Sequence, residues 1–296
     1  GETICKQMPA PFRSWLVDKT PLKRRLRVGY VSPDLMVHSV SYFIHSVLQS
    51  HDPSRFEVFV YSAVLKDDWK TEIFKQLVPP SRWRNITRNG VHLPDQHTAN
   101  LIRNDHIDIL VDLTGHCANN RLLTMALKPA PIIVGMIGYP NITGVPTIDY
   151  RIVDEFTDPS DVSDREIGNR QGEELYRLPG CFLCYTPCFH VGIPLPERAP
   201  SSQHGLVTFG CYNNLSKAGP KVWKLFQDVL RAVPNSRLTI KYKPFSIPLM
   251  TDAVFCKISV RNCQYTITPF VCHSIETTIE VLNQNGFRVH FSHVHR

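Results

Sequence analysis

Strand-like and helix-like patterns alternate over residues 26–155, and this alternation constrains the fold more than any other feature of the chain. The short apolar, β-branched runs that predict strands are 26–31, 56–61, 107–113, 132–136 and 148–153. The clearest helical spacing has apolar residues at Val40, Phe43, Ile44, Val47 and Leu48. Because parallel strands need crossover helices, the pattern predicts a mainly parallel sheet covered by helices.

The loops that leave these strands are where functional residues are expected. In open α/β sheets, ligands bind beyond the carboxyl ends of the strands. With further helices predicted at 97–104 and 121–127, the loops concerned are 32–39, 114–120 and 138–147.

A second alternation begins after residue 205. The segment 206–212 predicts a strand, 213–217 a loop, and Pro220 the first position of a helix, because proline is favoured there. A further strand is predicted at 237–242. This is one βαβ unit, and it predicts the opening of a second doubly wound domain.

Residues 156–204 separate the two alternations and show little periodicity. They are rich in Asp, Pro, Ser and Gly, with four prolines between 187 and 200, so we place the domain boundary there. The expected parts are a linker at 1–25, an N-terminal catalytic domain at 26–200, the start of a second domain at 201–245 and a divergent tail at 246–296.

The net charge and the hydropathy of the chain limit the kinds of partner that it can bind. The net charge of +7 indicates a basic surface or a phosphate-bearing small molecule. The dense basic run Lys23–Arg27 leads into a strand and has no interleaved aromatic residues, so nucleic acid is a poor fit. No run approaches the ~18 consecutive apolar residues of a membrane span, and we expect none.

The nine cysteines have no framework spacing, and we interpret them as reduced thiols of a cytosolic or nuclear protein. Cys181, Cys184, Cys188 and His190 stand close together, as zinc ligands do. A structural zinc site usually takes a second pair of ligands, which is missing nearby, so we predict no metal.

Two histidines lie on the loops singled out above. His38 precedes Ser39 in the first strand-to-helix loop, and His116 follows the strongest strand. An imidazole there could act as a base or bind a phosphate. A helix cap or a surface residue is the alternative for both.

Lys217 lies between a predicted strand end and a helix start. The N–H groups of a helix N-terminus favour an anion, and an ammonium beside them suits a diphosphate. A solvated loop lysine is the alternative.

The loop 138–146 contains Gly, Pro and Asn at close spacing, and such a loop can approach a ligand through its backbone.

Taken together, these segments resemble the catalytic region of the SPINDLY / O-GlcNAc transferase family. The resemblance covers about residues 26–245 in the family's order, with motifs such as Gly138-Tyr139-Pro140-Asn141. The similar segments are 26–34, 38–44, 107–116, 118–120, 129–131, 138–141, 143–144, 147–152, 173–175, 177–179, 181–187, 207–210, 213–215, 217 and 233–238.

The resemblance implies an α/β fold of the GT-B kind, with two Rossmann-like domains and a cleft between them. It implies inverting, metal-independent transfer of a sugar to Ser or Thr hydroxyls of intracellular proteins. The donor is UDP-N-acetylglucosamine or GDP-fucose, and no other cofactor is implied. Residues 1–25 would then follow an upstream TPR-type region.

The resemblance also assigns roles to residues. His38 matches the family histidine near the donor phosphates and the acceptor, and Lys217 matches the lysine that neutralises the leaving diphosphate. We expect the two to face each other across the cleft. The other residues expected to bind the donor are Asn214, His116, Tyr139 and Thr143.

Two departures from the family pattern lead to further expectations. The segment 160–172 is longer than the family's link, and the match ends near residue 245, about 50 residues before the end. We therefore expect an incomplete second domain, irregular packing over 246–272, and a chain that is inactive alone.

A non-catalytic binding module of the same family is the alternative function. A dinucleotide-dependent oxidoreductase is disfavoured because no G-x-G-x-x-G is present.

Overall fold

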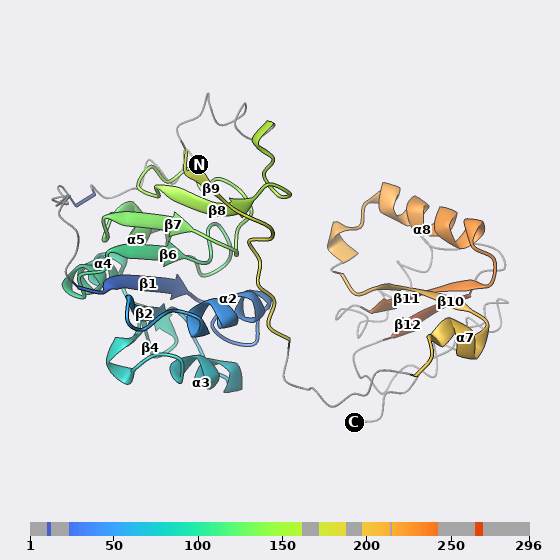
Figure 1. The fold of residues 1–296 in the computed structure, drawn as a ribbon, viewed down its shortest axis with the longest axis horizontal. Helices are drawn as coiled ribbons and strands as arrows, with labels where there is room; N and C mark the ends of the chain where they lie inside the picture. Colours follow the sequence, from blue (N-terminus) through green and yellow to red (C-terminus); the bar gives the residue numbers. More distant parts are fainter. Residues whose placement is uncertain are drawn as a thin grey trace. The chain divides into compact units, whose positions relative to one another are not determined.

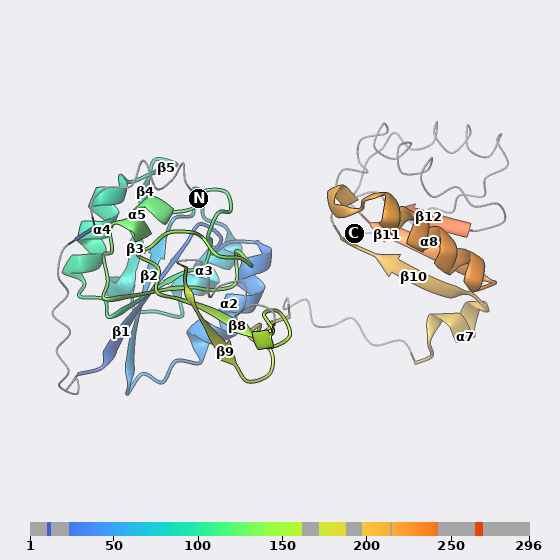
Figure 2. The same ribbon diagram turned by 90° about the horizontal axis from the view of Figure 1, so that it is seen from above.

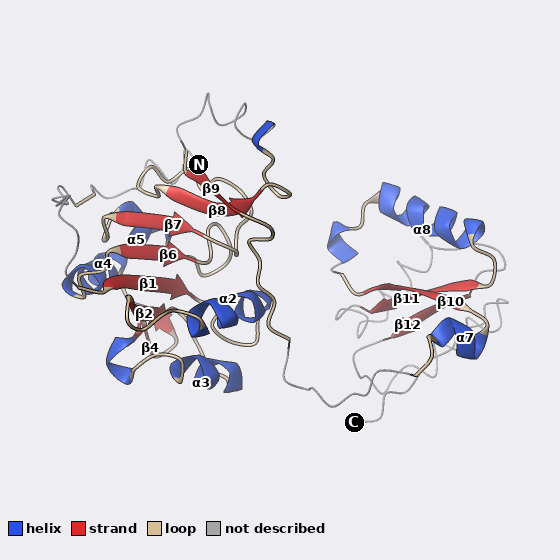
Figure 3. Ribbon diagram, viewed as in Figure 1, coloured by secondary structure: helices blue, strands red, loops and turns tan. Residues whose placement is uncertain are grey.

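The computed structural model describes residues 11–12, 24–161, 172–187, 197–213, 215–241 and 264–268. The chain divides into two compact units, Gly1–Val191 and Gly192–Arg296, and both have α/β structure (Figures 1 and 3). Among the described residues, no helix has the length and apolar character needed to cross a bilayer.

The first unit is built on a parallel seven-stranded sheet, in the order β3-β2-β1-β6-β7-β8-β9. The strands run from β1 outward in both directions, which is the doubly wound arrangement. Their bounds are β1 Leu26–Ser32, β2 Phe56–Ser62, β3 Trp83–Asn85, β6 Ile109–Asp112, β7 Ile132–Gly135, β8 Tyr150–Asp154 and β9 Glu174–Leu178.

Helices cover both faces of this sheet (Figure 2). Val40, Ile44 and Leu48 recur at helical spacing and pack into one apolar cluster together with Phe74. Ile102 belongs to a second cluster with the helix after β6. The elements concerned are α2 Ser39–Gln49 and α3 Trp69–Lys75 on one face, and α4 Asp95–Asn104 and α5 Leu122–Ala126 on the other. Short elements between them are η1 Pro80–Arg82 and the hairpin strands β4 Thr87–Arg88 and β5 Val91–His92.

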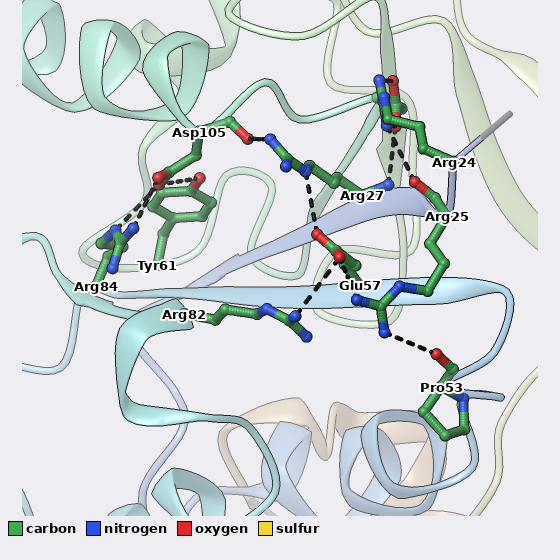
Figure 4. A network of polar contacts seen from close by, with 10 residues as sticks. Arg24, Arg25, Arg27, Pro53, Glu57, Tyr61, Arg82, Arg84 and Asp105 are labelled. Atoms are coloured by element: carbon green, nitrogen blue, oxygen red, sulfur yellow. Dashed lines mark hydrogen bonds and ion pairs between the residues drawn. The ribbon is translucent and has the colours of Figure 1, made fainter. Parts of the chain in front are cut away.

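The basic run before β1 is engaged within the first unit (Figure 4). Arg24 forms two hydrogen bonds with the carboxylate of Asp108, and Arg25 and Arg27 both pair with Glu57. Three arginines lie about the ring of one phenylalanine at 5.8–6.0 Å: Arg27, Arg82 and Arg84 around Phe59. These contacts tie the arginines of the basic run to Glu57 on β2 and to Asp108 just before β6.

The second unit contains a βαβ element in its described part. The strands β10, β11 and β12 pair in parallel, and α8 packs on β11 with Trp223 and Leu230 buried. The bounds are α7 Pro200–His204, β10 Val207–Cys211, η2 Leu215–Lys217, α8 Pro220–Ala232, β11 Ser236–Lys241 and β12 Gln264–Thr268.

The α/β class and the parallel sheet are confirmed, but two expectations about single elements are wrong. The interpretation of 156–204 as irregular misses β9, which pairs with β8. The expected irregularity of 246–272 fails at β12, which pairs with β11 over Gln264–Thr268. That segment is Gln-Tyr-Thr-Ile-Thr, rich in β-branched and aromatic residues, so a missing helical period did not mean a missing strand. The remainder of 246–272 lies outside the described residues.

Candidate active site

The strand order of the first unit reverses direction between β1 and β6. Strands β2 and β3 follow β1 on one side, while β7, β8 and β9 follow β6 on the other. At such a switch point the loops leaving the two central strands diverge and open a crevice at the carboxyl edge of the sheet. The loops 33–38 and 113–121 are the two that leave β1 and β6.

The loop after β1 presents His38 at the start of α2. His38 is the N-cap residue, with an extended backbone at φ −148° and ψ 156°, and its Nδ1 accepts from the Val40 amide at 3.4 Å. Its side chain is 44% exposed and lies 3.7 Å from the carboxylate of Asp34. His38 is therefore both a helix cap and a solvent-accessible imidazole beside a carboxyl group.

The loop after β6 is organised by Asp112, the last residue of the strand. Its carboxylate accepts from the amides of Thr114 at 3.2 Å and Gly115 at 2.9 Å. The side chain is buried, and burial raises the pKa of Asp112 to about 6 despite these hydrogen bonds. The turn thus presents His116, which is partly exposed, above a buried carboxyl group.

The loop after β7 is joined to the loop after β6 at several points. The Nε2 of His116 and the carbonyl oxygen of Thr143 are 2.7 Å apart, and the His116 ring meets Tyr139 edge to face at 5.1 Å. The thiol of Cys117 donates to the Gly138 carbonyl at 3.2 Å. The structure therefore brings together His116, Tyr139 and Thr143, which the sequence places far apart.

The loops after β1 and β6 leave adjacent strands that are paired in parallel, and Cys117 lies near carboxyl groups from both. Burial raises the pKa of this thiol, and the charges of Asp34 and Asp112 raise it further. Asp34 belongs to the loop after β1 and Asp112 to the end of β6, so both carboxyls lie within electrostatic reach of one thiol. The three loops therefore form one candidate site at the carboxyl edge of the sheet.

Two buried charged residues, one on β8 and one just before β9, support the loop 138–147. Glu173 precedes β9, and its Oε1 accepts from the Thr143 amide at 2.9 Å and from the Thr143 hydroxyl. Arg151 on β8 donates to the Pro140 carbonyl at 3.2 Å and pairs with Asp158. Because the Thr143 side chain is 5% exposed and bonded to Glu173, its hydroxyl is engaged inside the unit.

Sequence reasoning assigned no role to Asp34, Asp112 or Glu173. Asp34 and Asp112 stand at or just after strand ends, which is a usable signal. Glu173 follows a polar segment interpreted as a loop, and its burial arises from tertiary packing. No local sequence pattern predicts that this glutamate is buried.

Lys217 lies in the second unit, where the sequence placed it. It ends η2, between β10 and α8, and is exposed. Helix α8 begins after Gly219 with no side-chain cap and no acidic residue in its first turn. Asn214 lies outside the described residues. Since His38 and Lys217 belong to different units, their approach across a cleft stays a prediction.

Cys181 and Cys184 are exposed free thiols, and Ser46 on α2 donates to the sulfur of Cys184 at 3.2 Å. Cys188 and His190 lie outside the described residues. Within the described part of the chain, no three His, Cys, Asp or Glu side chains gather as metal ligands. The absence of a zinc site stays a prediction.

The buried carboxyl group of Asp112 makes stability depend on pH. Its pKa in the folded protein, about 6, lies above the ordinary value of 3.8, so the folded state holds the proton more tightly than the unfolded chain. Stability therefore falls as the pH rises from about 4 through 6. Two pKa units correspond to about 3 kcal/mol. We expect the free energy of unfolding of the wild type, relative to Asp112→Asn, to fall by up to about 3 kcal/mol between about pH 3 and pH 7.

Urea unfolding at a series of pH values measures this difference. The asparagine variant supplies the reference because it carries no titrating group at position 112. Parallel pH profiles for the two proteins would contradict the raised pKa.

The parallel, doubly wound sheet and the βαβ element of the second unit give the chain an α/β fold of the GT-B kind. The chain belongs to glycosyl transferase family 41, whose sequence model matches residues 3–182. That range includes all three loops of the candidate site.

Named relatives agree with this assignment. The chain is 49% identical over 236 residues to the probable UDP-N-acetylglucosamine–peptide N-acetylglucosaminyltransferase SPINDLY of Arabidopsis thaliana, covering 79% of this chain and 24% of the relative. It is 31% identical to the probable enzyme of the same activity named SEC from that plant, over 74% of this chain and 22% of the relative. The chain thus spans about a quarter of the length of these relatives.

A solved structure gives the same result for the fold. An O-GlcNAc transferase mutant from Thermobaculum terrenum is similar with a TM-score of 0.73 and 31% sequence identity. The similarity covers 92% of this chain and 49% of that one.

Proposed function

We propose that this chain is the catalytic part of a protein O-glycosyltransferase, acting by inverting, metal-independent transfer. The donor is a nucleotide-diphosphate sugar, either UDP-N-acetylglucosamine or GDP-fucose, and the acceptors are Ser and Thr hydroxyls of intracellular proteins. The observation that carries the proposal is the pair of imidazoles, His38 and His116, on the loops that flank the β1/β6 switch point of a family 41 chain.

The reaction needs a proton acceptor and a stabilised leaving group. The acceptor hydroxyl oxygen forms a bond to the anomeric carbon, its proton passes to a base, and the bond from that carbon to the diphosphate oxygen breaks. His38 supplies the base, because its imidazole is accessible and the lone pair of its Nδ1, which accepts from the Val40 amide at 3.4 Å, takes the proton as that contact is released. Breaking the bond leaves the additional negative charge on the diphosphate.

Lys217 and the start of α8 stabilise that charge. The helix has 13 residues, and its first-turn N–H groups have neither a side-chain cap nor a nearby acidic residue in that turn. An exposed ammonium immediately before it adds a full positive charge. These groups supply the electrostatic stabilisation that a divalent cation gives in other transferases, which supports a metal-independent mechanism.

Replacing Lys217 with alanine is therefore expected to lower the transfer rate roughly 10²–10³-fold, as removal of one oxyanion-stabilising donor does. Incorporation of a radiolabelled sugar from either donor into an acceptor protein measures the rate, in a longer protein that carries this chain within a full family catalytic region, because the chain by itself is expected to be inactive. Lys224→Ala is the matched control, because Lys224 is an exposed lysine beyond the first turn of α8, paired with Asp228, and it should leave the rate nearly unchanged. Equal rates in the two variants would remove Lys217 from the mechanism, and no transfer by the wild type from either donor would favour the binding-module alternative.

A further inference from the structure

The hydrogen bond between His116 and Thr143 determines which ring nitrogen of His116 carries the proton. Nε2 lies 2.7 Å from the Thr143 carbonyl oxygen, and a carbonyl oxygen only accepts hydrogen bonds. Nε2 is therefore the donor. In the neutral ring Nδ1 then has a lone pair and can accept a hydrogen bond from a hydroxyl group.

The position of that carbonyl depends in turn on Glu173. Its Oε1 accepts from both the amide and the hydroxyl of Thr143, and the same hydroxyl oxygen accepts from the Val145 amide at 3.2 Å. Glu173 is 1% exposed and Thr143 is 5% exposed, so water does not compete for these bonds. One carboxylate oxygen thus fixes the backbone of the loop at the residue that holds the His116 ring.

The burial of Glu173 is costly, which argues for a role beyond filling space. Its second oxygen, Oε2, is buried without a hydrogen-bond partner among the described residues. Burial raises the pKa of Glu173, with the Thr143 hydrogen bonds and the charge of Arg151 opposing the shift. A buried carboxyl group with an unpaired oxygen would be replaced at little cost by an apolar residue if it served stability alone.

We propose that Glu173 is a positioning residue that holds His116 in its Nε2–H tautomer through Thr143. The lone pair of Nδ1 is thereby kept for a substrate hydroxyl, of the donor sugar or of the acceptor. This consequence for transfer rests on the proposed function, whereas the tautomer itself can be measured without any substrate.

Two substitutions separate the hydrogen-bond geometry from the charge. Glu173→Asp keeps the carboxylate but shortens the side chain by one methylene, which withdraws the acceptor from Thr143. Glu173→Gln keeps the length and one acceptor oxygen but removes the charge. Glu174→Asp is the matched control, because Glu174 is the adjacent glutamate and is exposed.

The tautomer is measured by NMR on the purified protein with ¹⁵N-labelled histidine, at about pH 8, above the ordinary imidazole pKa of ~6.5. The His116 signals are those lost in His116→Gln. We expect the Nε2–H tautomer in the wild type, in Glu173→Gln and in Glu174→Asp, and a mixture of tautomers in Glu173→Asp. An Nδ1–H tautomer in the wild type would overturn the proposal by itself, and so would an unchanged tautomer in Glu173→Asp.

Transfer kinetics then test the consequence separately. Glu173→Asp should lower kcat with the KM for the donor little changed. Glu173→Gln should retain most of the wild-type kcat. A normal kcat in Glu173→Asp despite mixed tautomers would refute the role of the tautomer in transfer and leave the structural assignment standing. Absence of transfer by the wild type would instead contradict the proposed function, with the NMR result unaffected.

Discussion

Replacing His38 with asparagine is expected to lower the rate of sugar transfer roughly 10²–10⁴-fold, the usual contribution of a general base. Asparagine is among the preferred N-cap residues, so α2 keeps its cap while the imidazole is lost. The initial rate at saturating donor and acceptor measures the effect. Because the cap is preserved, the loss is assigned to the proton acceptor and not to an unfolded helix.

The matched control is His106→Asn. His106 is exposed and lies before β6, at the edge of the sheet opposite the candidate site. Its φ of 50° is a conformation that asparagine tolerates well. This variant should keep the wild-type rate. Similar losses in both variants would show that the effect is not specific to His38.

Replacing Gly138 with alanine is expected to destabilise the first unit by about 1–3 kcal/mol or more, as overpacking of a dense core does. A Cβ at this position would lie 1.9 Å from the Leu113 carbonyl oxygen, which belongs to the backbone and has no flexible end to move aside. The loop 138–147 would have to move away from the loop after β6. The His116–Thr143 hydrogen bond would be lost with it.

The midpoint of urea unfolding measures this loss of stability. Gly135→Ala is the matched control on the strand that precedes the loop, since the nearest atom to its added Cβ is the Tyr150 carbonyl oxygen at 3.9 Å. That variant should unfold at nearly the wild-type midpoint. Equal midpoints for the two variants would mean that the loops do not meet as closely as described.

Much of the fold is predictable from the sequence because long, strongly patterned segments carry the signal. The apolar spacing predicts α2, and Val40, Ile44 and Leu48 of that pattern are buried, whereas Phe43 and Val47 are half-buried. The run 107–113 predicts β6, although the strand itself is Ile109–Asp112. The parallel arrangement then follows, because each strand is separated from the next by a crossover.

Short elements were harder to predict for a physical reason. Strand β9 follows a polar segment and alternates only weakly, with Leu175 and Leu178 half-buried at the outer position of the sheet. The hairpin strands Thr87–Arg88 and Val91–His92 have two residues each, too few for any period. Their structure is set by tertiary contacts, which local propensity does not encode.

In the candidate site too, some features could be predicted from the sequence and others could not. The loops were predictable, because the carboxyl edge of a parallel sheet follows from its topology. The contacts of His116 with Tyr139 and Thr143 were not, since they join residues more than 20 positions apart. The burial of Asp112 and Glu173 was also invisible, because a sequence does not state which carboxylates fold into the interior.

The central claim, that this family 41 chain forms a protein O-glycosyltransferase, is tested most directly by mapping the bond that it makes. A longer protein that carries this chain within a full family catalytic region is incubated with an acceptor protein and with UDP-N-acetylglucosamine or GDP-fucose in separate reactions, and the acceptor is sequenced by mass spectrometry. The account predicts a sugar attached to the oxygen of Ser or Thr side chains with one of the two donors, and none in reactions with His38→Asn run for the same time. Acceptors that carry no sugar with either donor, or sugar attached equally by His38→Asn, would contradict it.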